Sequence, residues 1–144
     1  MPLALPAKKV LTLEAAKLAA AAAEATARQN GWKVVIAVVD DGGHALCLHR
    51  IDGTQASSVD TALGKARTAV HFKRPTRVLE EMVNQGRYAF LSVPGGAVVL
   101  QGGLPIEREG QLLGAVGVSG VKASDDEIIA QAGVDALLAA LGPP

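Results

Sequence analysis

The sequence predicts an α+β sandwich in which helices cover the faces of a five-stranded antiparallel sheet. Segments of strand length with apolar or alternating patterns follow one another directly, and short turns rich in glycine join them. Strands joined in this way pair antiparallel, and segments with helical periodicity must then pack on the faces of the sheet. Because 144 residues can bury one core, we expect a single domain over residues 1–144.

The first predicted helix runs from its cap at Thr12 to Asn30. Glu14 lies in the favoured first turn, and Gly31 is a typical stop. One face of this helix carries mainly alanine, at positions Leu13, Ala16, Ala20, Ala23 and Ala27. Because alanine is short, this face predicts close packing.

Two strands, a polar loop and two helices are predicted next, over residues 32–39, 44–51, 52–57, 58–72 and 76–85. The turn between the strands, from Asp40 to Gly43, consists only of Asp and Gly. Pro75 separates the two helices, since a proline disfavours helical backbone in the residue before it, and Gly86 ends the second helix.

The last third of the chain predicts an irregular stretch at 87–95, then three strands and a helix. The three strand candidates cover residues 97–101, 104–108 and 111–119. Gly102-Gly103 and Glu109-Gly110 supply the turns between them. A capping box from Ser124 to Glu127 opens a final helix that ends at Gly142.

Glycines recur in this strand-rich part of the chain. The run 113–120, LGAVGVSG, follows two glycine pairs at Gly95-Gly96 and Gly102-Gly103. Glycine inside a strand lowers stability and usually marks a bulge or the close approach of a backbone or a ligand. We therefore expect something to lie against this part of the sheet.

Composition limits the classes of partner. The chain has 14 basic and 14 acidic residues, and this zero net charge predicts neither nucleic-acid nor membrane binding. Charged residues interrupt the alanine-rich N-terminal part, so we expect no signal peptide, no membrane span and a cytoplasmic location. Cys47 is the single cysteine, which excludes an intramolecular disulfide. A small, neutral, apolar-rich domain also predicts a homo-oligomer.

An ordered set of short motifs resembles a known family. The matching residues are Ala37–Asp40, Gly43-His44, Arg50, Asp52-Gly53, Ser57, Lys65-Ala66, Thr68-Ala69, Arg74–Thr76, Gly95-Gly96, Gly102–Pro105, Gly114–Gly120, Asp126-Glu127 and Ala132-Gly133. Over residues 11–141 the chain resembles the GlcG/HbpS-like haem-binding family, whose domain also forms the C-terminal part of PduO-type cobalamin proteins. The resemblance implies a profilin-like α/β/α sandwich around a five-stranded antiparallel sheet. It also implies dimers, tetramers or octamers, and haem or corrinoid binding in some members.

Three histidines are candidate axial ligands for a haem iron. His44 opens a strand and His49 lies five residues further on, so the two side chains point to opposite faces of a regular strand. His71 lies near the end of the second helix, where the helix dipole alone also favours a cationic imidazole. Because no HxxxH, HxH or CxxC pattern is present, we expect no zinc site.

Three basic residues predict an anion pocket. Arg50 ends a strand, Lys65 lies within an apolar helix, and Arg74 lies at the helix break. Together with the backbone amides of Gly95-Gly96 they would bind a carboxylate or a haem propionate, and His71 completes this candidate cofactor site. The alternative is a solvated helix face with a loop ion pair.

Two chemical functions follow from these residues, beside a third option of a scaffold or chaperone-like oligomer without chemistry. The first is a protein that binds a small molecule, haem or a related tetrapyrrole, in an apolar pocket with a glycine floor and a basic rim. The alternative is a lyase, isomerase or hydrolase without a cofactor, which moves protons on a small carboxylate or ring-derived intermediate. Its candidate catalytic groups are His44, Asp52 and Lys65.

Overall fold

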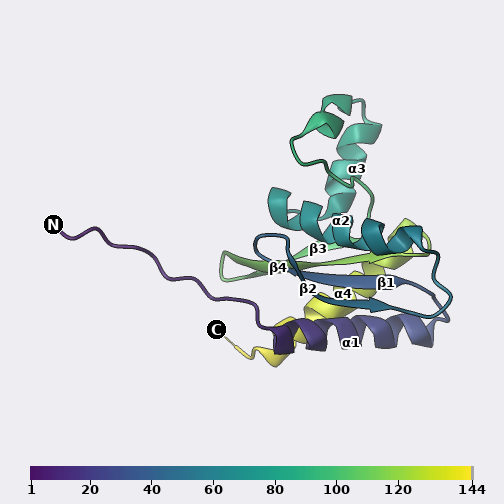
Figure 1. Ribbon diagram of the computed structural model, residues 1–144, viewed down its shortest axis with the longest axis horizontal. Helices are drawn as coiled ribbons and strands as arrows, with labels where there is room; N and C mark the ends of the chain where they lie inside the picture. The colour runs from purple at the N-terminus through teal and green to yellow at the C-terminus, as the bar shows by residue number, and fades with distance from the viewer. Residues whose placement is uncertain (144) are drawn as a thin grey trace.

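The computed structural model describes residues 1–143 and has three layers (Figure 1). An antiparallel sheet lies in the middle, α2 covers one face, and α1 and α4 cover the other. The elements in chain order are α1 (Leu13–Gln29), β1 (Val35–Asp40), β2 (Ala45–Arg50), α2 (Ser57–Phe72), α3 (Thr76–Asn84), the 3-10 helix η1 (Tyr88–Ser92), β3 (Gly103–Arg108), β4 (Gln111–Ser119) and α4 (Ala123–Ala140). The predicted α+β class is confirmed.

The sheet has the strand order β2-β1-β4-β3, and every neighbouring pair is antiparallel. Val35 of β1 lies opposite Arg50 of β2 on one side and Ser119 of β4 on the other. At the opposite end of β1, Asp40 pairs with Gly114. The β1–β2 and β3–β4 turns therefore lie at the same end of the sheet.

The prediction of a fifth strand over 97–101 is wrong, because the sheet has four strands. Side chains of two helices form hydrogen bonds with the backbone groups that would otherwise pair with a neighbouring strand. The N–H of Val98 donates to Oγ1 of Thr68 at 2.9 Å, and Oγ1 of Thr76 donates to the carbonyl of Leu100 at 2.6 Å. These contacts hold the segment against α2 and α3 instead of at the sheet edge.

The two faces of the sheet bury different side chains, since successive strand residues point to opposite sides. The face toward α1 and α4 is lined with branched aliphatic residues, among them Val34, Ile36, Val38, Ile106, Val116 and Val118. The face toward α2 is smaller, with strand residues Val35, Ala37, Val39 and Ala115 against helix residues Ala62, Ala66, Ala69 and Val70.

The backbone of α2 lies against the glycine-rich strand β4. A Cβ atom at Gly117 would lie 2.5 Å from the backbone nitrogen of Ala66 and would also collide with the carbonyl of Ala62. At Gly103 in β3, a Cβ atom would overlap the backbone of Lys65. The close approach that the glycines predict is therefore made by a helix of the same chain.

Two local predictions have different outcomes. Thr12 caps α1, and its side chain accepts a hydrogen bond from the N–H of Ala15 at 3.1 Å, as predicted. The capping box at Ser124 is wrong, because α4 begins at Ala123 and has no side-chain cap. Asp126 instead accepts from the N–H of Val121 at 3.2 Å, which ties the start of α4 to the end of β4.

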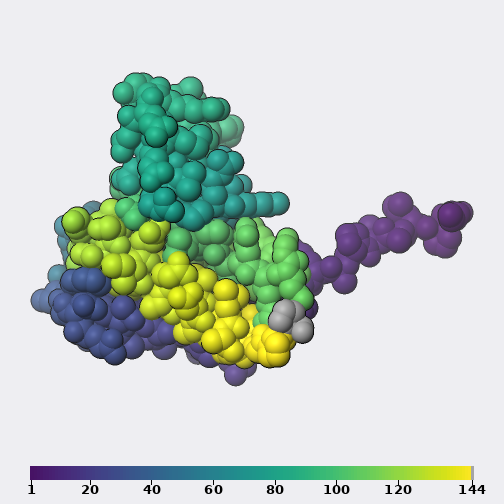
Figure 2. Space-filling view, turned by 180° about the vertical axis from the view of Figure 1, so that it is seen from behind, coloured from purple at the N-terminus to yellow at the C-terminus, as the bar shows by residue number. Residues whose placement is uncertain are grey.

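An arm made of α3 and η1 projects from the α2 side of the body (Figures 1 and 2). The ring of Phe90 in η1 packs against that of Phe72 at the end of α2, with 5.0 Å between ring centroids. Away from this arm, residues 1–7 extend into solvent. Within the described residues, no helix has the length and the apolar run needed to cross a bilayer.

Candidate functional site

The turn between β1 and β2 is held by the carboxylate of Asp40. Its Oδ1 accepts hydrogen bonds from the N–H groups of Gly42 at 2.9 Å and His44 at 3.0 Å. The bond from His44 is the main cause that lowers the pKa of the Asp40 carboxyl below its ordinary value, because hydrogen bonds to a carboxylate favour its charged form. The turn thereby fixes where the exposed imidazole of His44 leaves the sheet.

The C-terminal part of α2 contacts the same β1–β2 turn. Nε of Arg67 donates to the carbonyl of Gly43 at 3.3 Å, and Nε2 of His71 lies 3.3 Å from the carbonyl of Gly42. Gly43 has a positive φ of 85°, and a Cβ atom there would lie 3.0 Å from Nε2 of His71. Glycine is therefore needed at this position, and it allows the helix to sit directly on the turn.

These contacts bring His44 and His71 to one place. The ring of His44 lies beside Gly42, where a Cβ atom would be 3.2 Å from Cδ2 of His44, and Gly42 also contacts His71. Both imidazoles are exposed. We call the group of His44, Arg67 and His71 around Gly42-Gly43 the two-histidine surface.

Along the chain, residues at and just after the end of α2 contact the arm. Nε of Arg74 donates to the carbonyl of Phe72 at 3.3 Å, and its Nη1 lies 3.9 Å from the sulfur of Met82. Phe72 is half-buried against Phe90. The two-histidine surface is thus followed by an apolar pair of rings and a second arginine.

His49 lies apart from this surface. It pairs with Ile36 in the sheet, and its Nδ1 is 3.0 Å from the carboxylate of Glu24 in α1. Arg28 shares that carboxylate at 3.0 Å and is the main cause that lowers the pKa of Glu24. His49 is therefore engaged on the α1 face and does not meet the other two histidines.

Lys65 is buried under α2 and does not reach a pocket rim. Its Nζ donates to the carbonyl of Val118 at 2.8 Å and to the carboxylate of Asp126 at 3.1 Å. Both side chains of the pair are at most 3% exposed. Burial raises the pKa of Asp126, and the Lys65 charge offsets only part of this shift. The pair links α2, β4 and α4 in the interior.

The structure does not bring Arg50, Lys65 and Arg74 together. Nη2 of Arg50 lies 3.4 Å from the carbonyl of Thr54, just before α2 begins, whereas Arg74 lies just after α2 ends. A helix of 16 residues separates these two positions by about 24 Å. Gly95 and Gly96 are exposed beyond η1, with φ values of 80° and 77°.

The predicted acid–base group is also dispersed. His44 precedes the first residue of β2 and Asp52 follows its last, so a strand of six residues, about 20 Å long, lies between them. Lys65 is buried with Asp126. Among residues 1–143, no cluster of three or more His, Cys, Asp or Glu side chains is arranged to hold a metal ion.

Sequence reasoning missed two features of the site. It considered His44 and His71 separately, because nothing in their spacing shows that α2 ends on the β1–β2 turn. It also left Asp126 out of the Lys65 environment, since Asp126 fitted a capping box. The available signal was Lys65 itself, because a lysine within an apolar helix needs a buried partner.

The site is therefore two exposed imidazoles beside an arginine, at one end of the sheet of a small α+β domain. The chain belongs to the family described as haem degrading protein HbpS-like, whose model matches residues 11–135. It is 45% identical over 112 residues to protein GlcG of Escherichia coli strain K12, which covers 78% of this chain and 83% of GlcG.

Solved structures are similar over nearly the whole chain. A double mutant of HbpS from Streptomyces reticuli is 37% identical with a TM-score of 0.85, covering 99% of this chain and 98% of that one. The structure described as the PduOC:heme complex is 31% identical with a TM-score of 0.83, covering 89% of this chain and 95% of that one. The second of these proteins binds haem within the same fold.

Proposed function

We propose that this protein binds haem, or a related tetrapyrrole, at the two-histidine surface. The observation that carries the proposal is the placement of two exposed imidazoles, His44 and His71, on one glycine turn beside Arg67. Imidazole is a common axial ligand of haem iron. Family membership and a similar structure with bound haem support the ligand class.

One nitrogen of His71 is free to bind iron in this arrangement. The carbonyl of Gly42 can only accept a hydrogen bond, so Nε2 of His71 carries the proton when it makes this contact. The neutral ring then keeps its lone pair on Nδ1. His44 offers a second exposed imidazole at the same turn.

Arginines and aromatic rings suit the remaining parts of the ligand. The guanidinium groups of Arg67 and Arg74 would pair with the propionates, because they bind carboxylates with charge-assisted hydrogen bonds. Phe72 and Phe90 offer an apolar contact for the macrocycle. Lys65 takes no part in this proposal, since it is buried with Asp126.

A cavity near the start of α1 has a lining that does not suit haem. It has a volume of about 600 Å³, but no histidine, cysteine, methionine or tyrosine lines it. A haem there would lack the usual protein ligands to iron. The alternative of acid–base catalysis is not proposed, because its candidate groups are dispersed.

Titration of the purified protein with haemin, followed by visible absorption, tests the proposal. We expect a saturable Soret band that is lost in His44→Ala or His71→Ala. His49→Ala is the matched control, because this imidazole faces α1 and should leave the band unchanged. A broad band like that of free haemin, unaffected by all three substitutions, would contradict the proposal.

The propionate contacts have their own test. Arg67→Ala should weaken haemin binding up to about tenfold, which corresponds to about 1.4 kcal/mol. The same substitution should leave the affinity for haem dimethyl ester unchanged, because the ester has no carboxylates. An equal loss with both ligands would mean that Arg67 acts through the turn at Gly43 and not through a propionate.

A further inference from the structure

The first seven residues form an apolar segment without a partner in the described part of the chain. Residues 1–7 extend away from the body, as both overall views show (Figures 1 and 2). Leu3 and Leu5 are 91% and 84% exposed. Removing large aliphatic side chains from water is favourable, so this N-terminal segment is suited to bind an apolar surface.

Two contacts and two prolines restrict the directions in which the segment leaves the body. Nζ of Lys8 is 2.6 Å from the carboxylate of Asp41, and Nε2 of Gln111 donates to the carbonyl of Lys9 at 2.7 Å. Pro6 and Pro2 restrict the backbone further, because proline fixes φ. To turn back onto its own molecule, the segment would have to reverse direction immediately beside these contacts.

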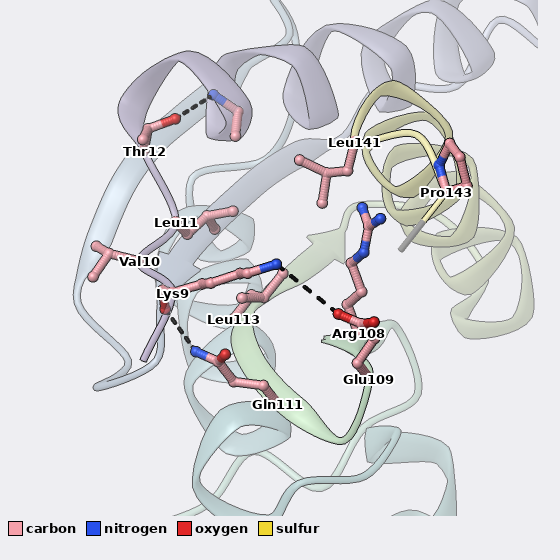
Figure 3. Close-up of a pocket in the computed structure, with 11 residues that line it drawn as sticks. Lys9, Val10, Leu11, Thr12, Arg108, Glu109, Gln111, Leu113, Leu141 and Pro143 are labelled. Carbon is pink, nitrogen blue, oxygen red and sulfur yellow. Dashed lines mark hydrogen bonds and ion pairs between the residues drawn. The ribbon is translucent and has the colours of Figure 1, made fainter. Parts of the chain in front are cut away.

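A cavity begins where this segment leaves the body (Figure 3). Lys9 and Val10 form part of its rim, and the buried side chains of Leu11 and Leu113 form its floor. Leu141 closes one side and is 42% exposed. A volume of about 600 Å³ is within the range of sites that hold a ligand or a short peptide segment.

We infer that residues 1–7 of one copy bind in this cavity on a second copy of the chain. Leu3 and Leu5 would cover the apolar floor at Leu11 and Leu113. Seven extended residues reach about 23 Å, so the segment can enter a cavity on a second copy whose rim lies within that distance. Because every copy carries both the segment and the cavity at adjacent positions, a two-fold axis near the rim would exchange the two segments and close the interface.

The charges at the cavity are compatible with a guest that has no charged side chains. The segment carries no charged side chain in residues 1–7. In Figure 3, Lys9 extends toward Glu109, and the two groups are 3.9 Å apart with both side chains at least half exposed. Such an ion pair contributes little, so it can move aside. None of the residues that line this cavity belongs to the two-histidine surface.

Cross-linking between different chains tests the exchange. In a Cys47→Ala background, chains carrying Leu5→Cys are mixed with chains carrying Leu141→Cys and treated with a short bis-maleimide. We expect mixed covalent dimers at least about fivefold more abundant than either same-variant dimer. A smaller excess of mixed dimers, including the roughly twofold excess that random pairing gives, overturns the inference, whether the cavity is empty or holds a copurified small molecule.

Two further variants test the alternatives within the same assay. A chain carrying both cysteines overturns the inference if its main product is an internal link, because the segment then occupies its own cavity. Adding Leu3→Asp to the Leu5→Cys chain should lower the mixed yield at least about fivefold. Ala4→Asp is the matched control, since alternate residues of an extended segment point to opposite sides, and its yield should change less than twofold.

Discussion

The two faces of the sheet are held by different chemistry. Toward α1 and α4, branched side chains such as Ile36 and Val118 interdigitate with apolar residues of the helices. Toward α2, alanine and glycine let the backbones meet, and the buried polar groups Lys65 and Thr76 bond to main-chain atoms. The face toward α1 and α4 gains stability mainly from buried apolar area. The contacts on the face toward α2 also fix the position of that helix.

This difference bears on the candidate site, which lies on the α2 side. His71 and Arg67 contact the Gly42-Gly43 turn only if α2 keeps its position along the strands of the sheet. The ion pair of Lys65 with Asp126 and the close contacts of α2 with glycines of the sheet fix this position near the middle of α2. We expect these two kinds of contact to contribute differently to the stability.

Lys65→Met should have the largest effect. It leaves the carboxyl of Asp126 buried without its ionic partner, and breaking a buried pair in this way costs about 3–5 kcal/mol. Urea unfolding measures the loss. Lys17→Met is the matched control, because Lys17 is exposed on α1 and should give no change within about 0.5 kcal/mol.

The double variant Lys65→Met with Asp126→Leu separates the charge from the packing. Replacing both partners with apolar residues should recover most of the stability, because no buried charge remains. A double variant as unstable as Lys65→Met would mean that the pair is required for its geometry and not for its neutralised charge.

Gly117→Ala should follow, with a loss of about 1–3 kcal/mol from overpacking against the α2 backbone. Gly133→Ala makes the same change between α4 and α1, on the other side of the sheet, where a Cβ atom would lie 2.8 Å from the carbonyl of Ala19. Its loss should be smaller by about 1 kcal/mol, since alanine favours a helix over glycine. Equal losses in thermal or urea unfolding would contradict the difference between the faces.

Thr76→Val should cost about 1–3 kcal/mol, because it keeps the shape and removes a buried hydroxyl. This hydroxyl donates to the carbonyl of Leu100 at 2.6 Å and accepts from the N–H of Gly103 at 2.9 Å. Hydrogen exchange at Gly103 should become faster. Thr61→Val, which removes an exposed hydroxyl bonded within α2, should change neither property.

The same threonines explain why part of the fold could not be predicted. Thr12 caps the start of α1 and Gly31 follows its end. Both are local signals that can be recognised in the sequence. Residues 97–101, AVVLQ, have the pattern of a strand, but Thr68 and Thr76 lie 30 and 24 positions from their partners in this segment. A pattern within five residues contains no information about such contacts.

The candidate site was predictable in its residue types and not in its arrangement. The histidines and arginines could be named, since imidazole and guanidinium are groups that a haem uses. Their grouping depends on the β1–β2 register and on where α2 ends, and the sequence does not show either. The sequence predicts Lys65 at the rim of an anion pocket because its charge is evident. Its buried partner Asp126 lies 61 positions away and cannot be identified from the pattern around Lys65.

Asp40→Asn should have the smallest effect, and one that depends on pH. The native fold holds the pKa of the Asp40 carboxyl below its ordinary value of 3.8, mainly through the N–H of His44. A lowered folded pKa adds stability above the unfolded value, and this contribution is lost as the pH falls through the folded value. Wild type should therefore exceed Asp40→Asn in stability at pH 7, and this difference should shrink below about pH 4.

The difference in stability between wild type and Asp40→Asn reports the titration of Asp40 alone, because all other titratable groups are common to both proteins. Thermal unfolding from pH 7 to pH 2 gives the measurement, and a gap that stays constant with pH would contradict the assigned role of the charge. Asp40 is partly exposed, whereas Asp126 is buried. The effect at Asp40 should therefore be far below that of Lys65→Met, since water screens a carboxylate at the turn and not one beneath α2.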